Sequence, residues 1–242
     1  MNGFTYNGTH SSAYNIIMKS ANRQLLPANA DIFIEIPGRH GSHHVPGKLQ
    51  DRIITLDCQY VKTTLALLRS NARSVAAWLY TNDRASLVFD DEPGKTYTGK
   101  YTGSVDLENA FAKGAFSLTF RCEPFAESTE VTTNFAGDAA NITNSGTAEA
   151  EPYFLATFTA SASEWKVTLG TDYIRVVDTF TAGDTLEITT ETGAVLINSA
   201  RAMDKLDWQN SRFFTLPVGT ASLTITPTGK CSVVMKHTPK FL

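Results

Sequence analysis

The stretch DIFIEIPGRHGSHHVPGKLQDRIITLDCQY, residues 31–60, contains two runs in which apolar and polar side chains alternate. A period of two predicts strands whose apolar side chains share one face of a sheet. These side chains are Ile32, Ile34 and Ile36 in the first run, and Ile54, Leu56, Cys58 and Tyr60 in the second. The Pro and Gly residues between the runs end the strands and favour a long loop that leaves the sheet. The sequence therefore predicts two sheet strands joined by a projecting loop.

The predicted loop carries four residues suited to contacts, Arg39, His40, His43 and His44. A guanidinium can bind carboxylates or carbonyls through two hydrogen bonds, which an ammonium cannot reproduce. We expect these four residues to lie at an interface with another protein subunit; the alternative is that Arg39 bonds carbonyls of its own loop. His40 and His44 are spaced to share a metal only on a helix, which the Gly and Pro residues disfavour, so no metal site is expected.

Length and composition restrict the class of protein. A chain of 242 residues with 42% hydrophobic and 19% charged residues is globular, and can form one large β domain or two ordinary ones. A net charge of −3 gives no overall attraction to nucleic acid or to anionic membranes. The sequence contains no apolar run of about 18 residues, so no membrane-spanning helix is expected. The first residues lack a secretion-signal pattern.

The three cysteines are Cys58, Cys122 and Cys231. Each lies at an inward-facing position of an alternating run. Their odd number and wide spacing favour buried free thiols over disulfides or metal ligands. This usage is typical of a chain made in a reducing cytosol.

Residues 63–80 hold the one clear helical pattern in the chain. Apolar side chains recur at steps of three and four, which predicts a helix that covers one face of a sheet. The stripe consists of Leu65, Leu68, Ala72, Val75 and Leu79. Between residues 81 and 125, Pro93 and Gly94 suit the centre of a type II turn. The acidic group before them, residues 90–92, is expected to be a solvated hairpin tip and not a cation site. The alternating run that follows, residues 114–125, predicts a strand that Pro124 ends.

Near residue 126 the composition changes to Thr, Asn, Ala, Gly and Ser, which indicates a domain junction. We therefore predict two domains, residues 1–128 and residues 129–242. Beyond a short strand at 140–143, turn signals separate a series of alternating runs, which favours an antiparallel sandwich or jelly roll. These runs are 153–160, 165–169, 173–177, 185–190, 194–198, 212–216, 222–226 and 231–237. The predicted fold class is mainly β, with two domains and one helix.

The chain contains no recognisable catalytic motif. No nucleophile elbow, phosphate-binding loop, dinucleotide fingerprint or zinc-protease motif occurs, so we expect no enzyme, no catalytic residue and no cofactor. Trp208 lies in the polar segment DKLDWQNSRF between predicted strands, and we predict an exposed ligand contact there, such as stacking on a sugar ring. Trp165 lies on an alternating strand and is expected in the core.

Several segments form an ordered set: GFTYNGTHSSAYNIIMKS, EIPGRHGS, FDDEPGKTY, FSLTFRCEPFAES and ITNSGTAEAEP. Together they resemble the Dit-like distal tail protein family of long-tailed phages that infect Gram-positive hosts. His40 replaces the Asp or Asn that is usual in the family's version of the second segment. The resemblance covers about 150 residues in consistent order and becomes one of pattern alone after Glu151.

The resemblance implies a β-sandwich first domain with one helix and a long hairpin, and a galectin-like second domain. It implies a homo-oligomer, a hexameric ring around a channel through which DNA would pass. The ring would join the tail tube protein to the tail-associated protein and carry receptor-binding or baseplate proteins. The chain would then be made in the host cytoplasm and placed in the virion at the tail tip. The jelly-roll pattern alone also supports a carbohydrate-binding adhesion module, and the His residues leave a metal-dependent hydrolase as a third hypothesis.

Overall fold

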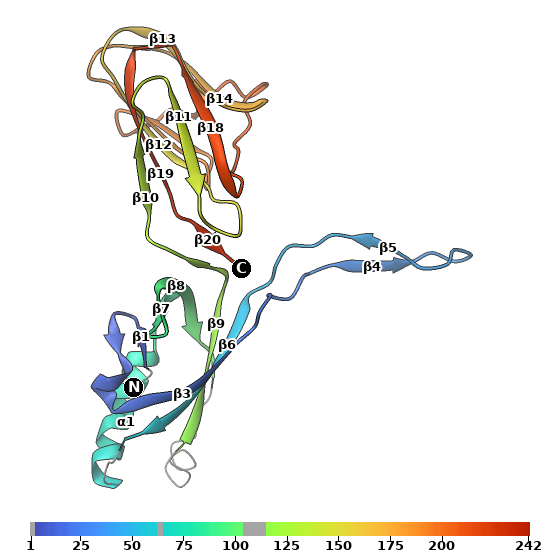
Figure 1. Cartoon of the computed structure of the whole chain (residues 1–242), viewed down its shortest axis with the longest axis vertical. Coiled ribbons are helices and arrows are strands. Elements are labelled where there is room, and N and C mark those ends of the chain that lie inside the picture. The colour runs from blue at the N-terminus through green and yellow to red at the C-terminus, as the bar shows by residue number, and fades with distance from the viewer. Residues whose placement is uncertain (1–2, 62–64, 104–114) are drawn as a thin grey trace. The chain divides into compact units, whose positions relative to one another are not determined.

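The computed structural model describes residues 3–61, 65–103 and 115–242, and the side chains of residues 65–71 are not described (Figure 1). The chain divides into two compact units, residues 1–127 together with Leu242, and residues 128–241. Both are built mainly of antiparallel strands, and one α-helix occurs in the described ranges. The mainly β, two-domain fold predicted from the sequence is confirmed. No helix among the described residues is long and apolar enough to cross a membrane.

The first unit is organised by one antiparallel sheet with the strand order β2-β1-β7-β8-β9-β6-β3. In that order the strands are Thr9–His10, Phe4–Tyr6, Ala85–Phe89, Glu92–Tyr101, Ala115–Glu127, Arg52–Tyr60 and Ile16–Arg23. A 3-10 helix, η1 (Ser11–Tyr14), precedes β3. The rings of Tyr6 on β1 and Phe120 on β9 are 4.9 Å apart although two strands separate β1 from β9. The sheet therefore curls, and its inner face packs against itself.

Helix α1 (Leu65–Leu79) covers the first strands of this sheet. Trp78 is buried, stacks on Phe4 at 5.6 Å, and donates its indole N–H to the carbonyl of Tyr6 at 2.8 Å. Of the predicted stripe, Val75 and Leu79 are buried and Ala72 is half-buried; the side chains of Leu65 and Leu68 lie outside the described ones. The sequence pattern missed Trp78, which anchors the helix.

Two predictions about the strands that follow the helix, one on the β7–β8 turn and one on the end of β9, are wrong. The turn between β7 and β8 is formed by Asp90 and Asp91, because Phe89 pairs directly with Glu92. Pro93 and Gly94 lie within β8 and are not the centre of the turn. Pro124 does not end β9, which continues to Glu127.

The segment of residues 31–60 folds differently from its prediction. Its second run is β6, with Ile54, Leu56 and Cys58 buried as predicted, and its neighbours in the sheet are β3 and β9. The first run, β4 (Ile32–Glu35), pairs instead with β5 (Ser42–Val45), inside the stretch predicted to be a loop. The apolar side chains predicted to share a face are exposed, at 58% for Ile32, 48% for Ile34 and 43% for Ile36. Alternation identified the strand correctly but could not show that no other described segment covers it.

Strands β3 to β6 form one long antiparallel hairpin. Its base pairs Ile16 with Tyr60 and continues to Arg23 paired with Ile54. Farther out, a bridge joins Asn29 to Leu49, and β4 and β5 complete the end. We call residues 24–51 the arm. Every residue of β4 and β5 is exposed, so the arm projects beyond the sheet that carries it (Figure 1).

The second unit is a sandwich of two antiparallel sheets. One has the order β10-β19-β12-β15-β16-β17: Val131–Asn134, Cys231–His237, Tyr153–Phe158, Thr185–Thr189, Ala194–Ile197 and Ala200–Arg201. The other has the order β11-β18-β13-β14: Ala139–Asn144, Gly219–Thr226, Ala162–Leu169 and Asp172–Phe180. Residues 212–216, predicted as a strand, form only a bridge between Leu216 and Ala150, which corrects that assignment. β10 was not predicted.

Aromatic side chains from both sheets fill the core of the sandwich. Trp165 on β13 is fully buried, as predicted, and meets Phe154 on β12 edge to face at 6.1 Å. Phe158 and Phe180 stack with ring centroids 4.0 Å apart. Such pairs add about 0.5–1.5 kcal/mol beyond the area that they bury.

The predicted free thiols are confirmed. Cys58 and Cys122 are buried, Cys231 is half-buried, and none forms a disulfide. Burial raises the pKa of Cys58 and of Cys122 to about 12. Their thiolate forms are therefore scarce at neutral pH, which makes both side chains inert packing groups.

Candidate functional site

The tip of the arm presents the predicted contact residues. Arg39 and His40 lie in the turn between β4 and β5, and His43 and His44 lie on β5 itself. Gly38 and Gly41 have φ values of +83° and +80°, so the turn needs glycine at both places. A hollow of about 540 Å³ is lined by Glu35, Ile36, Pro37, Arg39, Gly41 and Ser42.

The guanidinium of Arg39 is exposed at this tip. Its backbone N–H donates to the carbonyl of Ile36 at 3.1 Å. Within the described residues its side chain has no hydrogen-bond or ion-pair partner, so it does not hold its own loop together. A free guanidinium keeps its donors available for carboxylates or carbonyls of another molecule.

His44 is held against its own arm. Its ring stacks on Phe33 with centroids 4.9 Å apart, and its Nε2 lies 3.0 Å from a carboxylate oxygen of Asp31. The other Asp31 oxygen accepts a hydrogen bond from the Gly47 backbone at 2.7 Å. These two interactions, the backbone bond first, lower the pKa of Asp31. His43, the preceding residue on the strand, points to the opposite face of the ribbon.

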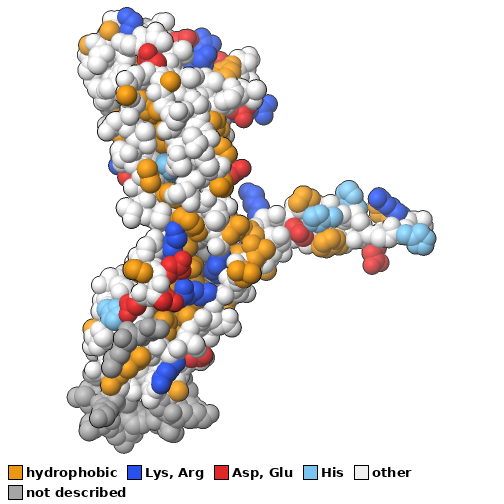
Figure 2. Space-filling view, in the orientation of Figure 1, with side chains coloured by type: hydrophobic (Ala, Val, Ile, Leu, Met, Phe, Trp, Pro, Cys, Tyr) orange, Lys and Arg blue, Asp and Glu red, His pale blue; other side chains and the backbone are white. Residues whose placement is uncertain are grey.

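Apolar side chains are exposed on both faces of the arm. Figure 2 shows hydrophobic, histidine and charged side chains distributed along its length. The exposed apolar residues on its strands and tip are Ile32, Phe33, Ile34, Ile36 and Val45, with exposed fractions of 37–63%. An isolated two-stranded ribbon is marginally stable in water, and contiguous exposed apolar surface usually marks an interaction site. The arm is thus a candidate interaction surface.

The base of the arm is fixed by two arginines that the sequence analysis did not single out. Arg23 binds Asp91 at 2.5 Å and Glu92 at 3.1 Å, and its guanidinium lies 4.2 Å from the centre of the Phe89 ring. Arg52 is buried and donates to the carbonyls of Gln24 at 2.9 Å and Pro124 at 3.2 Å. Partners so far apart in sequence give no local signal.

The acidic group at residues 90–92 lies at the hairpin tip, with Asp90 and Asp91 exposed as expected, and its carboxylates also bind neighbouring residues. Asp90 accepts a hydrogen bond from the backbone N–H of Gly3 at 2.8 Å and lies 3.2 Å from His10. The other two carboxylates bind Arg23. The hairpin tip is therefore tied to neighbouring strands, because its charges meet side chains and a backbone donor from β2, β3 and the N-terminal residues.

Trp208 is exposed on the second unit, with 63% of its surface accessible. It follows the 3-10 helix η2 (Met203–Lys205), and its indole N–H donates to the carbonyl of Met203 at 2.9 Å. The segment runs along the edge strand β14, where the N–H of Asp207 bonds the carbonyl of Arg175 at 2.9 Å. An exposed indole is thus held in a fixed position.

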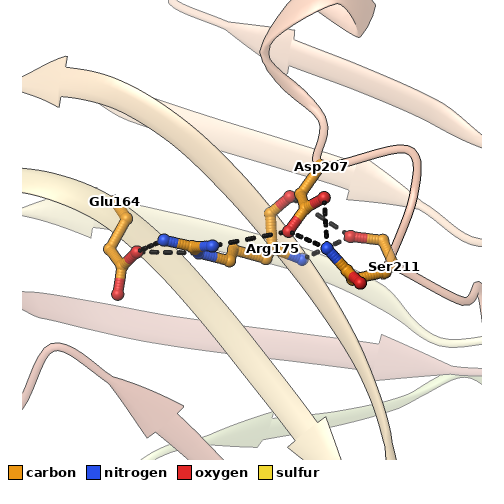
Figure 3. Close-up of polar contacts among 5 residues, drawn as sticks. Glu164, Arg175, Asp207 and Ser211 are labelled. Carbon is orange, nitrogen blue, oxygen red and sulfur yellow. Dashed lines mark hydrogen bonds and ion pairs between the residues drawn. The ribbon is translucent and has the colours of Figure 1, made fainter.

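Arg175 connects this segment to the face of the sheet (Figure 3). Its guanidinium binds Glu164 through Nε at 2.7 Å and also through Nη2, and it reaches Asp207 at 3.4 Å. Asn210 donates to the same Asp207 carboxylate at 3.0 Å, and Ser211 accepts from the Arg175 backbone at 3.0 Å. The hydrogen bonds and charges of the two carboxylates, Glu164 first, raise the pKa of Arg175.

The described residues contain no group of three or more His, Cys, Asp or Glu side chains that could hold a metal ion. The arm histidines do not converge with Asp51 or Asp57. Asp51 binds Arg84 and Arg121, and Asp57 accepts hydrogen bonds from Ser20 and Ser117. Both carboxylates are therefore engaged by side chains outside the arm.

Comparison with protein families defines the class of this protein. Residues 12–122 match the model of the phage tail protein RIFT-related domain, and residues 145–241 match the siphovirus-type tail component, C-terminal domain. The two matches cover both units, so the protein is a tail component of the siphovirus type. Within that class, the chain belongs to the Dit-like distal tail protein family.

Individual relatives agree with this assignment. The distal tail protein of Bacillus phage SPP1 is 29% identical over 143 residues, which are 54% of this chain and 55% of that protein. The crystal structure of SPP1 Dit has a TM-score of 0.85 at 20% identity, covers 100% of both chains, and thus shows the same fold. It is described as a paradigm of the hub adsorption apparatus in phages that infect Gram-positive bacteria. A chain of the phage p2 baseplate is 8% identical, with 98% of each chain covered, and has a TM-score of 0.47.

Proposed function

We propose that this tail component is the structural hub of a phage tail tip, in which six copies close into a ring through residues 1–128. The ring joins the tail tube protein to the tail-associated protein and carries receptor-binding or baseplate proteins. It surrounds the channel for DNA without binding nucleic acid, and it acts in the virion after synthesis in the host cytoplasm. The chain performs no catalysis in this role. The observation that carries the proposal is the arm, an apolar ribbon that no other described part of the chain covers.

A second copy of the chain is the partner that best explains the arm. In a ring every subunit offers the same surface to its neighbour, so the same arm contact is repeated at every subunit interface. Covering the exposed apolar side chains of β4 and β5 would stabilise the assembly by about 25 cal/mol for each Å² buried. The unpaired Arg39 then binds a carboxylate or carbonyl of the neighbouring protein.

The arm can be removed without disturbing its base. Asn29 and Leu49 are bridged partners, so an Asn-Gly turn can replace residues 30–48 and close the hairpin there. Arg23, Arg52 and their partners remain in place. We expect the full chain to form a six-subunit ring, seen by light scattering and electron microscopy, and the shortened chain to stay monomeric with unchanged unfolding of its body.

A pair of point variants separates a specific contact of the arm from non-specific association of exposed apolar side chains. Ile34→Asp on the arm should prevent assembly, whereas Val177→Asp on the second unit should not, although the two side chains are similarly exposed, at 48% and 45%. A full chain that remains monomeric at high concentration, and is absent from rings in purified tails, would refute the proposed function. Rings formed by the shortened chain would refute the role of the arm.

We also propose that the two domains fold separately. Contacts divide the chain after Glu127, one residue before the boundary expected from composition. Fragments 1–127 and 128–242, expressed alone, should each unfold cooperatively in urea. A fragment without cooperative unfolding would show that the domains depend on each other.

A further inference from the structure

We propose that Trp208 and the turn that carries it form a shallow binding site for a neutral hexopyranose ring of a glycan. The site lies on the second unit and adds a ligand contact to the structural role proposed above. It consists of the indole of Trp208, the turn of residues 207–210, and the Arg175 network beneath it.

The indole is both accessible and immobilised. Trp208 is 63% exposed, yet its N–H is bonded to the Met203 carbonyl at 2.9 Å, which fixes the ring to the segment before it. The faces of an aromatic ring carry negative charge density and attract polarised C–H groups, such as those on the apolar face of a pyranose. Because the indole is already ordered, a ligand that stacks on it loses little side-chain entropy.

The turn that presents the indole is also ordered before any ligand binds. The Asp207 carbonyl accepts from the N–H groups of Asn210 at 3.3 Å and Ser211 at 2.8 Å. Gln209, which directly follows Trp208 in this turn, is exposed. Amide side chains next to an aromatic platform can donate to and accept from sugar hydroxyls, so the turn combines stacking with hydrogen bonding.

Two cations beside the Trp208 turn are paired with carboxylates, so they are not available to an anionic ligand. Arg175 is bound by Glu164 and Asp207, and Lys205 lies 3.4 Å from Asp178. Both of these cations are therefore already occupied by carboxylates. The Asp207 carboxylate, held by Asn210 and Arg175, keeps acceptor capacity for a hydroxyl.

The surroundings favour a sugar over a protein partner. Among the described residues of the second unit, Trp208 is the one aromatic side chain in the set of exposed large hydrophobic residues; the others are Val131, Val177 and Val218. Protein interfaces usually have a central cluster of buried apolar residues. A lone indole in polar surroundings instead matches the size of one sugar ring, and it contrasts with the apolar arm.

Acrylamide quenching of tryptophan fluorescence tests the site in the full chain. Trp78 and Trp165 are buried, so quenching reports on Trp208. The probes are the methyl glycosides of glucose, galactose, mannose and N-acetylglucosamine. We expect at least one of them to protect the indole with a dissociation constant on the order of 1 mM. Saturation-transfer NMR should place the strongest contact on the C–H groups of one sugar face.

Variants assign the contact to individual side chains. Trp208→Ala should weaken sugar binding in the NMR experiment by about tenfold or more, whereas Trp208→Phe should retain part of it. Asn210→Ala should weaken binding less, and Phe33→Ala on the arm should leave it unchanged. If none of the four glycosides binds, or if Trp208→Ala binds as well as the parent chain, the proposal is overturned. Either result leaves the ring proposal standing, because assembly is measured separately.

Discussion

Strands β6 and β4 belong to one long hairpin and have the same alternating pattern, yet their environments are opposite. Ile54 on β6 is fully buried, whereas Ile34 on β4 is 48% exposed. β6 lies between β3 and β9 in a sheet that curls over its own side chains, while β4 has β5 as its one neighbour. A strand pattern thus specifies which side chains share a face, and the partners of the strand decide whether that face is buried.

This difference separates folding from binding within one hairpin. The apolar side chains of β6 leave water when the chain folds and contribute to the stability of the first unit. Those of β4 and β5 stay in water in the single chain, so their transfer free energy is available only when another molecule covers them. We therefore expect substitutions in the body to affect unfolding, and substitutions in the arm to affect assembly.

The largest effect is expected from a matched pair of isoleucine truncations. Ile54→Ala leaves a cavity in the closed core and should lower the free energy of unfolding by about 2–5 kcal/mol. Ile34→Ala removes the same atoms from an exposed ribbon and should change it by less than about 0.5 kcal/mol. Urea denaturation of the monomer, followed by the fluorescence of the buried Trp78, measures both. Equal losses would show that the arm packs on its own body and would abolish the distinction.

The body of the first unit could be predicted in part because its signals are local. The spacing of Val75 and Leu79 indicated the buried face of α1, and alternation identified the inner residues of β6 and β9. The turn at Asp90 and Asp91 was missed because Pro93 and Gly94 gave a stronger local signal. The pairing of Asp91 and Glu92 with Arg23 then fixes the real hairpin from another strand.

The candidate contact sites show the same limit. Arg39 and Trp208 were identified from their positions between predicted strands, and both are exposed in the structure. Glu164 and Arg175 gave no comparable signal, since they lie on two strands and meet through tertiary pairing. The exposure of β4 could not be predicted either, because a sequence pattern does not state whether other elements of the chain cover a strand.

A smaller effect, confined to assembly, is expected from Arg39. Arg39→Ala should leave the unfolding of the single chain unchanged, because the guanidinium has no partner among the described residues. It should weaken subunit association by roughly 2 kcal/mol per contact, as for loss of one member of an interfacial charge pair. Arg39→Lys should weaken subunit association nearly as much, because an ammonium cannot form the bidentate contact. Analytical ultracentrifugation over a concentration series gives both values. Normal assembly of Arg39→Ala would place the contact elsewhere on the arm.

The smallest effect concerns acid and the order of the arm itself. The Gly47 backbone bond and His44 lower the pKa of Asp31 from 3.8, so the folded arm favours the ionised carboxylate. The resulting stabilisation is complete above the ordinary pKa and is lost as the pH falls through the lower pKa of the folded arm. Below about pH 4, the β4–β5 amides should therefore lose protection relative to their intrinsic exchange rates, while those of β6 stay protected.

Carboxyl NMR shifts of Asp31 and amide exchange rates measure this response together. Asp31→Asn should remove the acid dependence of the β4–β5 amides. Asp57→Asn serves as the control: Asp57 lies on β6, and its pKa is lowered by hydrogen bonds from Ser117 and Ser20. That substitution should leave the acid response of the arm intact. An Asp31 pKa at or above 3.8 in the folded chain would mean that the Gly47 and His44 contacts do not hold the free arm. The arm would then gain its order from the partner that covers it.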